Sequence, residues 1–377
     1  MNIFDREEKK VEYLELIYDL VFVYMVGRNN SLLGHIEGGF IPPLNFLAYV
    51  LCTLAIIQIW NFTTFYVNLF GRNGVRDHVF LLINMYLMYF IGEATRTDFQ
   101  AYQTQYHIAW ALILINIGVQ YMIELRNHQV DVWNRDIIKR MALTLFVEAG
   151  IVLIAAIPNP VLGTVMSAVA ILSGVILTFI SRAAGPGAPV DFMHLTERAM
   201  LYVVFTFGEM IIAIAAYFKG DGSFDWSVIY FSLMGFLIVV GLFLSYGILY
   251  DHLINREMQD NGLRYMVIHI FIIFSLNNIT ISLEFMRETE VDLMPKMVFL
   301  IASIVGYYVF LFCTYPYAKL QCRPSRPFIT KLLAVTAAFV VLMIIFREQM
   351  YVNILITVIY VFGTVLVLKN AELSMEE

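Results

Sequence analysis

Charged side chains stand inside several long apolar runs of this chain. Glu15 and Asp19 are four residues apart in the first run, so they lie on the same face of a helix. Two carboxylates placed in this way can share one proton, which is the chemistry of a proton-coupled step. An ionisable residue at the centre of a membrane-spanning helix costs about 2.5–3.5 kcal/mol on insertion scales, so it normally faces a cavity or a partner.

A second group of charges lies in the segment 194–209, HLTERAMLYVVFTFGE. Arg198 is the one strongly basic residue that we place inside a span, and Glu15 and Asp19 are its expected partners. Eleven residues separate Arg198 from Glu209, which puts them near one helix face but about 16 Å apart along the axis. Each therefore needs partners on other helices. For Arg198 we predict either a structural lock or a gate that breaks during transport.

These charges and the polar residues in other spans form two predicted sets. The substrate- or proton-coupling set consists of Glu15, Asp19, Glu197, Arg198 and Glu209. The supporting set lines a pocket and consists of His194, Trp60, Asn61, Asn68, Glu93, Glu148, Tyr250, Asp251, Asn277 and Asn278. Aromatic faces can hold an organic cation. The alternative for each residue is a structural role, either joining helices by hydrogen bonds or lying at a solvated helix end.

The composition is that of a protein dissolved in lipid. Of the 377 residues, 60% are hydrophobic and only 14% are charged, whereas soluble domains have about 25% charged residues. The mean hydropathy is +0.74. The apolar residues also come in long blocks, so the expected fold is all-α, a polytopic integral membrane protein. The net charge of −6 gives no indication of a nucleic-acid partner.

A membrane-spanning helix needs about 20 apolar residues. This length predicts about twelve transmembrane helices, at residues 11–30, 42–69, 77–95, 105–124, 138–157, 160–181, 193–218, 226–250, 262–285, 295–317, 327–346 and 350–368. The shortest connections are Pro158-Asn159-Pro160 and Arg347-Glu348-Gln349. These two connections are the weakest points of the count, and eleven or thirteen spans are the alternatives.

The basic residues predict the orientation. With twelve spans, 17 of the 24 Lys and Arg residues lie on the side of the N-terminus, 6 lie on the other side, and Arg198 lies within a helix. The excess of positive charge places both termini in the cytoplasm. The start of the chain, MNIFDREEKKVE, lacks the pattern of a cleavable signal, so we expect the first helix to stay in the mature protein.

A Gly- and Pro-rich stretch near the midpoint predicts two halves. We expect a first six-helix half at 1–184, a cytoplasmic linker at 185–190 and a second six-helix half at 191–377. Each half begins its first apolar run after a glutamate, Glu15 or Glu197. A parallel repeat of this kind places the pseudo-two-fold axis along the membrane normal and a site between the halves near the midplane. The alternative is that hydrophobic segments resemble one another without duplication.

Sequence motifs of soluble enzymes are not found in the chain. It contains no GxxxxGK[ST] loop, HExxH pair or EF-hand pattern, so we expect neither direct use of ATP nor a metal site. The three cysteines, Cys52, Cys313 and Cys322, form no CxxC pair. We therefore predict no cofactor, and an enzymatic activity is the less favoured interpretation.

Two segments resemble the signatures of the bacterial low-temperature-requirement A family. Residues 15–23, ELIYDLVFV, are similar to its opening signature, and residues 194–209 are similar to its second signature. Polar positions of the family's second and eighth spans match Trp60-Asn61 with Asn68, and Tyr250-Asp251. The resemblance covers most of the chain and departs from the family pattern at Arg28-Asn29-Asn30.

This resemblance implies a multi-pass protein of the bacterial cell membrane, and it implies no particular activity. It marks as motif residues Glu15, Asp19, His194, Glu197, Arg198, Gly208 and Glu209.

The leading functional hypothesis is a secondary transporter, driven by protons or another ion, for a small cationic or zwitterionic solute. A channel or a lipid-handling or lipid-sensing protein is the first alternative. A membrane-embedded enzyme or a receptor-like binding module is the second. The expected partners are membrane lipids and a small-molecule or ion substrate, without nucleic acid, and a homodimer is an open alternative to a monomer.

Overall fold

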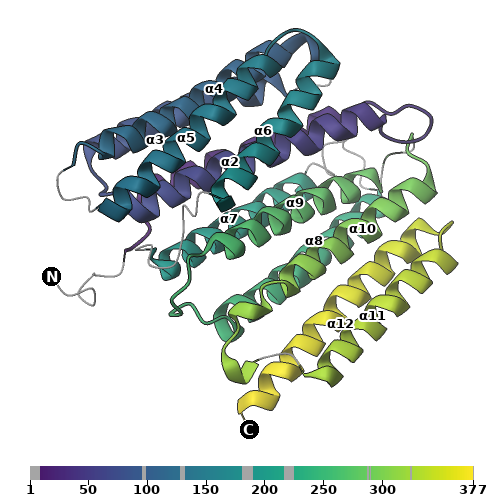
Figure 1. Cartoon of the computed structure of the whole chain (residues 1–377). Coiled ribbons are helices and arrows are strands. Elements are labelled where there is room, and N and C mark those ends of the chain that lie inside the picture. The colour runs from purple at the N-terminus through teal and green to yellow at the C-terminus, as the bar shows by residue number, and fades with distance from the viewer. Residues whose placement is uncertain are drawn as a thin grey trace. The chain divides into compact units, whose positions relative to one another are not determined.

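The computed structural model is helical (Figure 1) and describes residues 9–95, 99–127, 132–180, 190–215, 225–286, 288, 290–322 and 325–376. Within these ranges the chain forms twelve α-helices and no β-sheet. The helices are α1 (Tyr13–Arg28), α2 (Pro43–Phe70), α3 (Val75–Ala94), α4 (Phe99–Glu124), α5 (Val132–Ala155), α6 (Pro160–Ile180), α7 (Phe192–Ala215), α8 (Trp226–Gly247), α9 (Leu263–Phe285), α10 (Leu293–Phe312), α11 (Arg326–Ile345) and α12 (Met350–Glu376).

Each of the twelve predicted segments coincides with one of these helices. Both of the short connections are genuine breaks: α5 ends at Ala155 before α6 begins at Pro160, and α11 ends at Ile345 before α12 begins at Met350. Proline is favoured in the first turn of a helix because its missing N–H would have no intrahelical partner there. The predicted helix boundaries are therefore confirmed to within a few residues at these two points.

In the described part of the chain, nine helices are long and apolar enough to cross a membrane, namely α2, α4 and α6 to α12. The other three helices are shorter or more polar. α1 has 16 residues, and the first turns of α5 carry Arg135, Asp136, Lys139 and Arg140. The chain is thus a multi-pass helical membrane protein, and the twelve-span arrangement in two halves stays a prediction.

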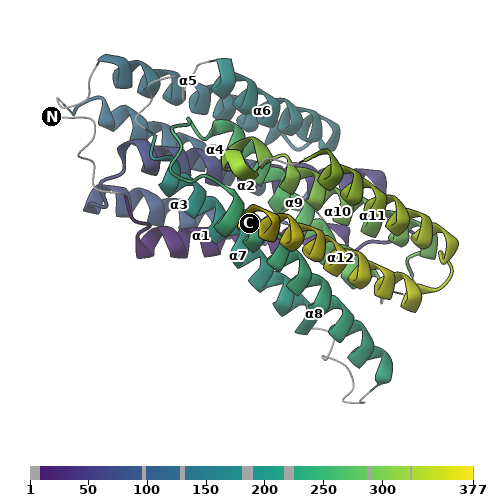
Figure 2. The ribbon, with the colours of Figure 1, turned by 90° about the horizontal axis from the view of Figure 1, so that it is seen from below.

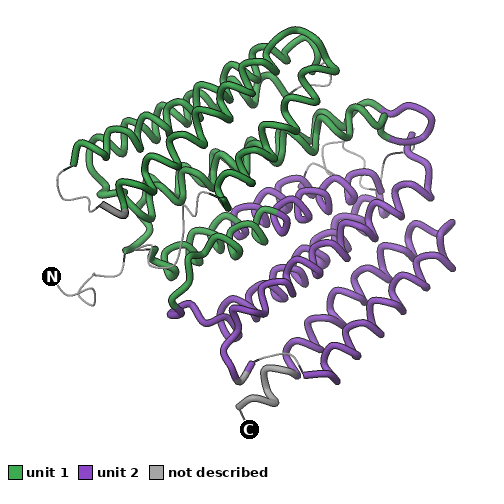
Figure 3. Tube along the Cα trace, in the orientation of Figure 1, with its two compact units in different colours: residues 1–35, 41–202, 259–270 green, residues 36–40, 203–258, 271–377 purple. Residues whose placement is uncertain are grey.

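The chain forms two compact units, which Figure 3 shows in green and purple. Unit 1 contains residues 1–35, 41–202 and 259–270, and unit 2 contains residues 36–40, 203–258 and 271–377. α7 and α9 contribute residues to both units. Residues 185–189 of the predicted linker lie outside the described residues.

In unit 1, α3, α4, α5 and α6 pack in chain order, each against the next, and α2 contacts α1, α4 and α6 (Figure 1). Small residues allow this close approach. The buried face of α6 carries Gly163, Ser167, Ala170 and Gly174. Its opposite face exposes larger side chains such as Leu172, as expected for a helix that turns one face to lipid and another to its neighbours.

In unit 2, α12 packs against α8 and α11, and α11 also contacts α10. α11 and α12 lie side by side in both views of the chain (Figures 1 and 2). Gly241 of α8 leaves room for the side chain of Val361 on α12. Many large apolar side chains of α11 are exposed, including Leu333, Val341 and Ile345, which fits a helix surrounded by lipid.

A prediction about folding concerns the two glycines that precede Phe40. Both have positive φ, +60° at Gly38 and +82° at Gly39. A side chain at Gly38 would enter open space, whereas one at Gly39 would collide with the carboxylate of Asp292. Since Asn tolerates positive φ better than most residues, we expect Gly38→Asn to leave stability nearly unchanged. Gly39→Asn should lower stability more than Gly38→Asn does, because the carboxylate of Asp292 must move to admit the new side chain.

Thermal unfolding of both variants in detergent measures this difference. Equal unfolding midpoints for the two variants would contradict the close approach of Gly39 to Asp292.

Candidate functional site

Five buried side chains of unit 1 form what we call the Arg198 cluster: Glu15, Asp19, Trp60, His194 and Arg198. α1 presents both carboxylates on one face, and α7 brings Arg198 against them. The Nε of Arg198 donates to Oδ2 of Asp19 at 2.9 Å, its Nη2 donates to Oδ1 of Asp19, and its Nη1 donates to Glu15. The predicted pairing of Arg198 with Glu15 and Asp19 is thus confirmed.

The cluster is closed to water. Arg198 is 1% exposed and Asp19 is 0% exposed. The indole N–H of Trp60 donates to Oδ1 of Asp19 at 2.7 Å, and the guanidinium carbon of Arg198 lies 6.0 Å from the centre of the Trp60 ring. Asp19 therefore accepts one indole and two guanidinium hydrogen bonds, which compensates much of the cost of removing its charge from water.

The tautomer of His194 follows from its contact with Asn68. The amide oxygen of Asn68 accepts from the backbone N–H of Asp191 at 3.1 Å, and its amide nitrogen donates to the backbone oxygen of Asp191 at 2.8 Å. The same nitrogen lies 3.1 Å from Nδ1 of His194. Because an amide nitrogen only donates, Nδ1 accepts, and a neutral ring carries its hydrogen on Nε2. Nε2 lies 3.4 Å from Oε2 of Glu15.

The segment that precedes α1 is hydrogen-bonded to the start of α7. Asp191 caps α7 by accepting the backbone N–H of His194 at 3.0 Å. It also accepts the backbone N–H of Lys9 at 3.2 Å. The ammonium group of Lys9 donates to backbone oxygens of Val67 and Gly71 at the end of α2. Burial lowers the pKa of Lys9, an effect that the carboxylate of Glu15 opposes.

Sequence reasoning missed Lys9 and Asp191 as parts of this site. Both lie just outside predicted spans, where a charge is normally solvated. Only their contacts show that they hold α1, α2 and α7 together at this end of the cluster.

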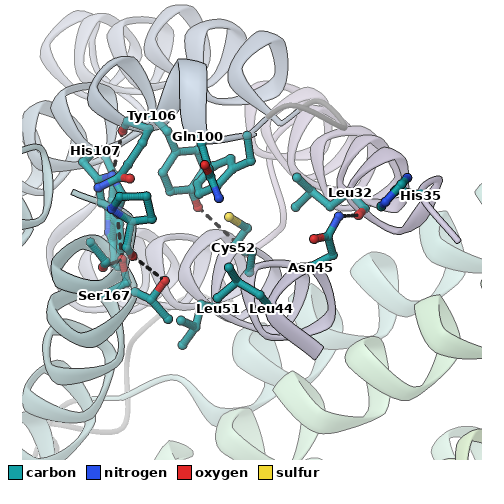
Figure 4. Close-up of a pocket in the computed structure, with 17 residues that line it drawn as sticks. Leu32, His35, Leu44, Asn45, Leu51, Cys52, Gln100, Tyr106, His107 and Ser167 are labelled. Carbon is teal, nitrogen blue, oxygen red and sulfur yellow. Dashed lines mark hydrogen bonds between the residues drawn. The ribbon is translucent and has the colours of Figure 1, made fainter. Parts of the chain in front are cut away.

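Unit 1 also contains a cavity of about 430 Å³ between α2, α4 and α6 (Figure 4). Its rim includes the exposed residues His35, Leu44 and Gln100, and its buried floor consists of Cys52, Gln103, Tyr106, His107, Trp110 and Ser167. Among the described residues that line it there is no Asp, Glu, Lys or Arg. The cavity is therefore electrically neutral apart from its histidines.

Hydrogen bonds fix the floor of the cavity. Nδ1 of His107 lies 2.7 Å from the backbone oxygen of Gln103, and Nε2 lies 2.7 Å from the hydroxyl of Ser167. The hydroxyl of Tyr106 donates to the backbone oxygen of Cys52 at 3.3 Å. These bonds join α2, α4 and α6 and give the floor a defined shape.

None of the cavity residues was predicted as part of a site. A signal was present, because Gln103, His107 and Trp110 follow one another at spacings of four and three residues, which places them on one face of a helix. Gly163 and Ser167 have the same spacing on α6. The missing information was that these two faces come together.

Glu148 of α5 lies apart from the Arg198 cluster. Its side chain is 0% exposed, and neither carboxylate oxygen has a hydrogen-bond donor in the described part of the chain. Its Oε2 and the Nε2 of Gln58 both reach the space beside Gly174, where a Cβ atom would meet them.

Three other predicted residues of unit 1 are placed outside the Arg198 cluster. Glu197 is half-buried beside Arg198 in sequence, but Arg198 pairs with carboxylates of α1. Asn61 is buried on α2 next to Trp60, and its amide oxygen has no hydrogen-bond partner among the described residues. Glu93 lies 3.7 Å from Arg28, and both side chains are partly exposed.

The other predicted residues belong to unit 2. Glu209 is half-buried on α7, and Asn277 and Asn278 are buried on α9. Tyr250 is buried beneath the guanidinium of Arg256, whose carbon lies 4.9 Å from the ring centre, and Asp251 is exposed. Their participation in a site with the Arg198 cluster stays a prediction. Across the described ranges, no group of three or more His, Cys, Asp or Glu residues is arranged to hold a metal ion.

Comparison with known families identifies the chain. The family model for the bacterial low temperature requirement A protein (LtrA) matches residues 10–365, nearly the whole chain. This protein belongs to the LtrA family. The resemblance inferred from the two signature segments is thereby confirmed. No curated protein and no solved structure matches the chain.

The two LtrA-like signatures meet in space. Glu15 and Asp19 come from the first signature, and His194 and Arg198 come from the second, and all four side chains belong to the Arg198 cluster. These four signature residues therefore join α1 to α7.

Removal of the guanidinium should be strongly destabilising. Arg198→Met leaves two buried carboxylates without their cation, a change that costs about 3–5 kcal/mol in buried ion pairs. The triple variant Glu15→Gln/Asp19→Asn/Arg198→Met removes the carboxylate charges as well, so it should recover part of this loss. Thermostability of the detergent-solubilised proteins, followed by size-exclusion chromatography, measures both effects. A triple variant no more stable than Arg198→Met would show that unpaired charge is not the cause.

Proposed function

We propose that this LtrA-family protein is a secondary transporter that couples the movement of a small solute across the bacterial cell membrane to protons or another ion. In this proposal twelve helices span the membrane in two six-helix halves, 1–184 and 191–377, with both termini in the cytoplasm. Membrane lipids surround it, and a homodimer is the alternative to a monomer.

The observation that carries the proposal is the buried Arg198 cluster. Buried ion pairs rarely stabilise a protein more than well-packed apolar side chains of the same size would. Charges inside membrane-spanning helices normally belong to substrate or ion pathways. Stability alone therefore does not account for a guanidinium and two carboxylates at this position.

The charges of the cluster support a coupling step. Two carboxylates face one guanidinium, so Glu15, Asp19 and Arg198 together carry one excess negative charge when all are ionised. A proton or a small cation neutralises that charge. Binding to either carboxylate weakens one of the bonds between α1 and α7, so occupancy of the site and the pairing of the helices are linked.

The cavity supports a solute site. Its volume of about 430 Å³ lies within the range of about 300–1,000 Å³ that is usual for small-molecule sites. The rings of Tyr106 and Trp110 offer aromatic faces to a cationic or zwitterionic solute, and the polar groups of the floor offer hydrogen bonds. The cavity lies at the N-terminal ends of α2, α4 and α6, which is the extracytoplasmic side in the proposed orientation.

Reconstituted protein tests the proposal directly. Proteoliposomes that contain a pH-sensitive dye are exposed to a panel of small cationic and zwitterionic solutes. We expect one solute class to change the internal pH, and a protonophore to abolish its accumulation. Downhill flux without any coupling to an ion gradient would favour the channel alternative, and no flux of any solute would refute transport.

Glu209 is the residue of the coupling set that belongs to unit 2. If it titrates during transport, Glu209→Gln should lower pH-coupled flux at least about tenfold, as expected for loss of an essential acid–base group. Glu93→Gln provides the control, because Glu93 is partly exposed and close to Arg28. Full pH-coupled flux in Glu209→Gln would show that its assignment is wrong.

Filling the cavity should block transport without unfolding the protein. Ala48 lines the cavity, whereas its neighbour Leu47 does not and is 42% exposed. We expect Ala48→Phe to raise the KM for the solute or abolish its transport, because the added ring occupies the cavity. Leu47→Phe should transport normally, and both variants should keep the thermostability of the native protein. Equal transport by the two variants would exclude this cavity as the solute site.

A further inference from the structure

Glu148 is a buried carboxylate without a counter-ion. It lies in the second half of α5 and is 0% exposed, and in the described ranges no donor reaches either of its oxygens. Other buried carboxylates of unit 1 are paired. Asp19 and Glu15 have Arg198, and Glu124 on α4 lies 3.0 Å from Arg72 and 2.7 Å from Arg76.

The polar group beside Glu148 is a neutral amide rather than a cation. Nε2 of Gln58 donates to the backbone oxygen of Ile171 at 3.2 Å, and Oε1 of Gln58 has no partner among the described residues. Oε2 of Glu148 and Nε2 of Gln58 both lie over Gly174, whose missing side chain provides the space. The amide of Gln58 carries no charge, so it cannot compensate a buried carboxylate ion as the arginines beside Glu124 do.

In the described structure, no titratable group on the neighbouring helices donates a hydrogen bond to Glu148. α4 and α6 pack against α5, and Gln58 comes from α2. α6 has no titratable residue. The other two helices carry the titratable residues Tyr102, Tyr106, His107, Tyr121 and Glu124 of α4, and Tyr49, Cys52 and Tyr66 of α2. In the described structure none of these side chains donates to Glu148.

An isolated carboxylate ion in apolar surroundings is far less stable than the neutral acid. We propose that Glu148 is a proton-binding site, and that its proton is the one coupled to solute movement. The first part of this proposal stands without the proposed function, and the second part rests on it. The proposal moves the proton-binding role from the Arg198 cluster to Glu148. The Arg198 cluster then controls only the pairing of α1 with α7.

The cavity and Glu148 lie along one face of α6. Ser167 on the cavity floor and Gly174 beside Glu148 lie on the same buried face of α6, seven residues or about 10 Å apart. Between them the buried residues of α6 are Ala170 and Ile171. Glu148 is therefore about two helical turns beyond the floor of the cavity, on the side away from its rim.

Infrared difference spectroscopy tests the proton site without requiring transport. The spectrum of the native protein minus that of Glu148→Gln at neutral pH should contain the carbonyl band of a protonated carboxylic acid. Raising the pH should replace that band by carboxylate bands. Glu124→Gln is the matched control, since Glu124 is equally buried but paired with two arginines, and its difference spectrum should show carboxylate bands throughout. Carboxylate bands for Glu148 at neutral pH would overturn the proposal.

Stability provides a second test of the same proposal. Gln has the shape of the neutral acid, so Glu148→Gln should keep the unfolding midpoint of the native protein. Glu124→Gln removes the partner of Arg72 and Arg76 and should unfold at a lower temperature. A Glu148→Gln variant that loses as much stability as Glu124→Gln would indicate a charged Glu148 held by a cation, and one that gains stability would indicate an unpaired charge. Either result would contradict the proposal.

Transport separates the coupling role from proton binding. In proteoliposomes, Glu148→Gln should lower proton-driven accumulation at least tenfold while keeping exchange of labelled for unlabelled solute, which needs no net proton movement. Unchanged proton-driven accumulation would overturn the coupling role. If the native protein moves no solute at all, the proposed function fails, and the infrared result still decides whether Glu148 binds a proton.

Discussion

One buried guanidinium determines how the first helix of this protein is held. Arg198 uses three of its nitrogens on two carboxylates of α1, and Trp60 adds a fourth donor from α2. Because all of these groups are buried, none of them is tolerable alone in this environment. The positions of α1, α2 and the start of α7 therefore depend on one another, and Asn68, Asp191 and Lys9 extend this dependence to the ends of the helices.

The two sites described in unit 1 differ in their chemistry. The Arg198 cluster is charged, closed and built from the LtrA-like signatures, whereas the cavity is neutral, open at its rim and built from residues outside those signatures. Glu148 pairs with no residue of the cluster and does not line the cavity. In the proposed transport mechanism, this separation would allow solute binding, proton binding and helix pairing to be altered one at a time.

Much of the fold follows from the sequence. Long apolar runs and the breaks at Pro158-Asn159-Pro160 and Arg347-Glu348-Gln349 predict the twelve helices, because helix length in a membrane is set by the thickness of the lipid. The pairing of Arg198 with Glu15 and Asp19 is also predictable, since a buried cation has few partners to choose from. The cavity and the space beside Gly174, which Glu148 and Gln58 reach, are not predictable in this way. They depend on which faces of α2, α4, α5 and α6 meet, and short-range patterns do not contain that information.

The geometry of the Arg198 cluster also restricts how α1 can move. Glu15 and Asp19 are one turn apart on the same face, so a rotation of α1 by one residue, about 100°, would turn both carboxylates away from the guanidinium. A slide along the helix axis by four residues, about 6 Å, would instead bring Asp19 to the place that Glu15 now occupies and keep one ion pair intact. A slide of α1 along its axis therefore breaks one of the two ion pairs of Arg198, whereas a rotation of α1 about its axis breaks both. If α1 changes position during the working cycle, the charges favour a register shift of one turn against α7.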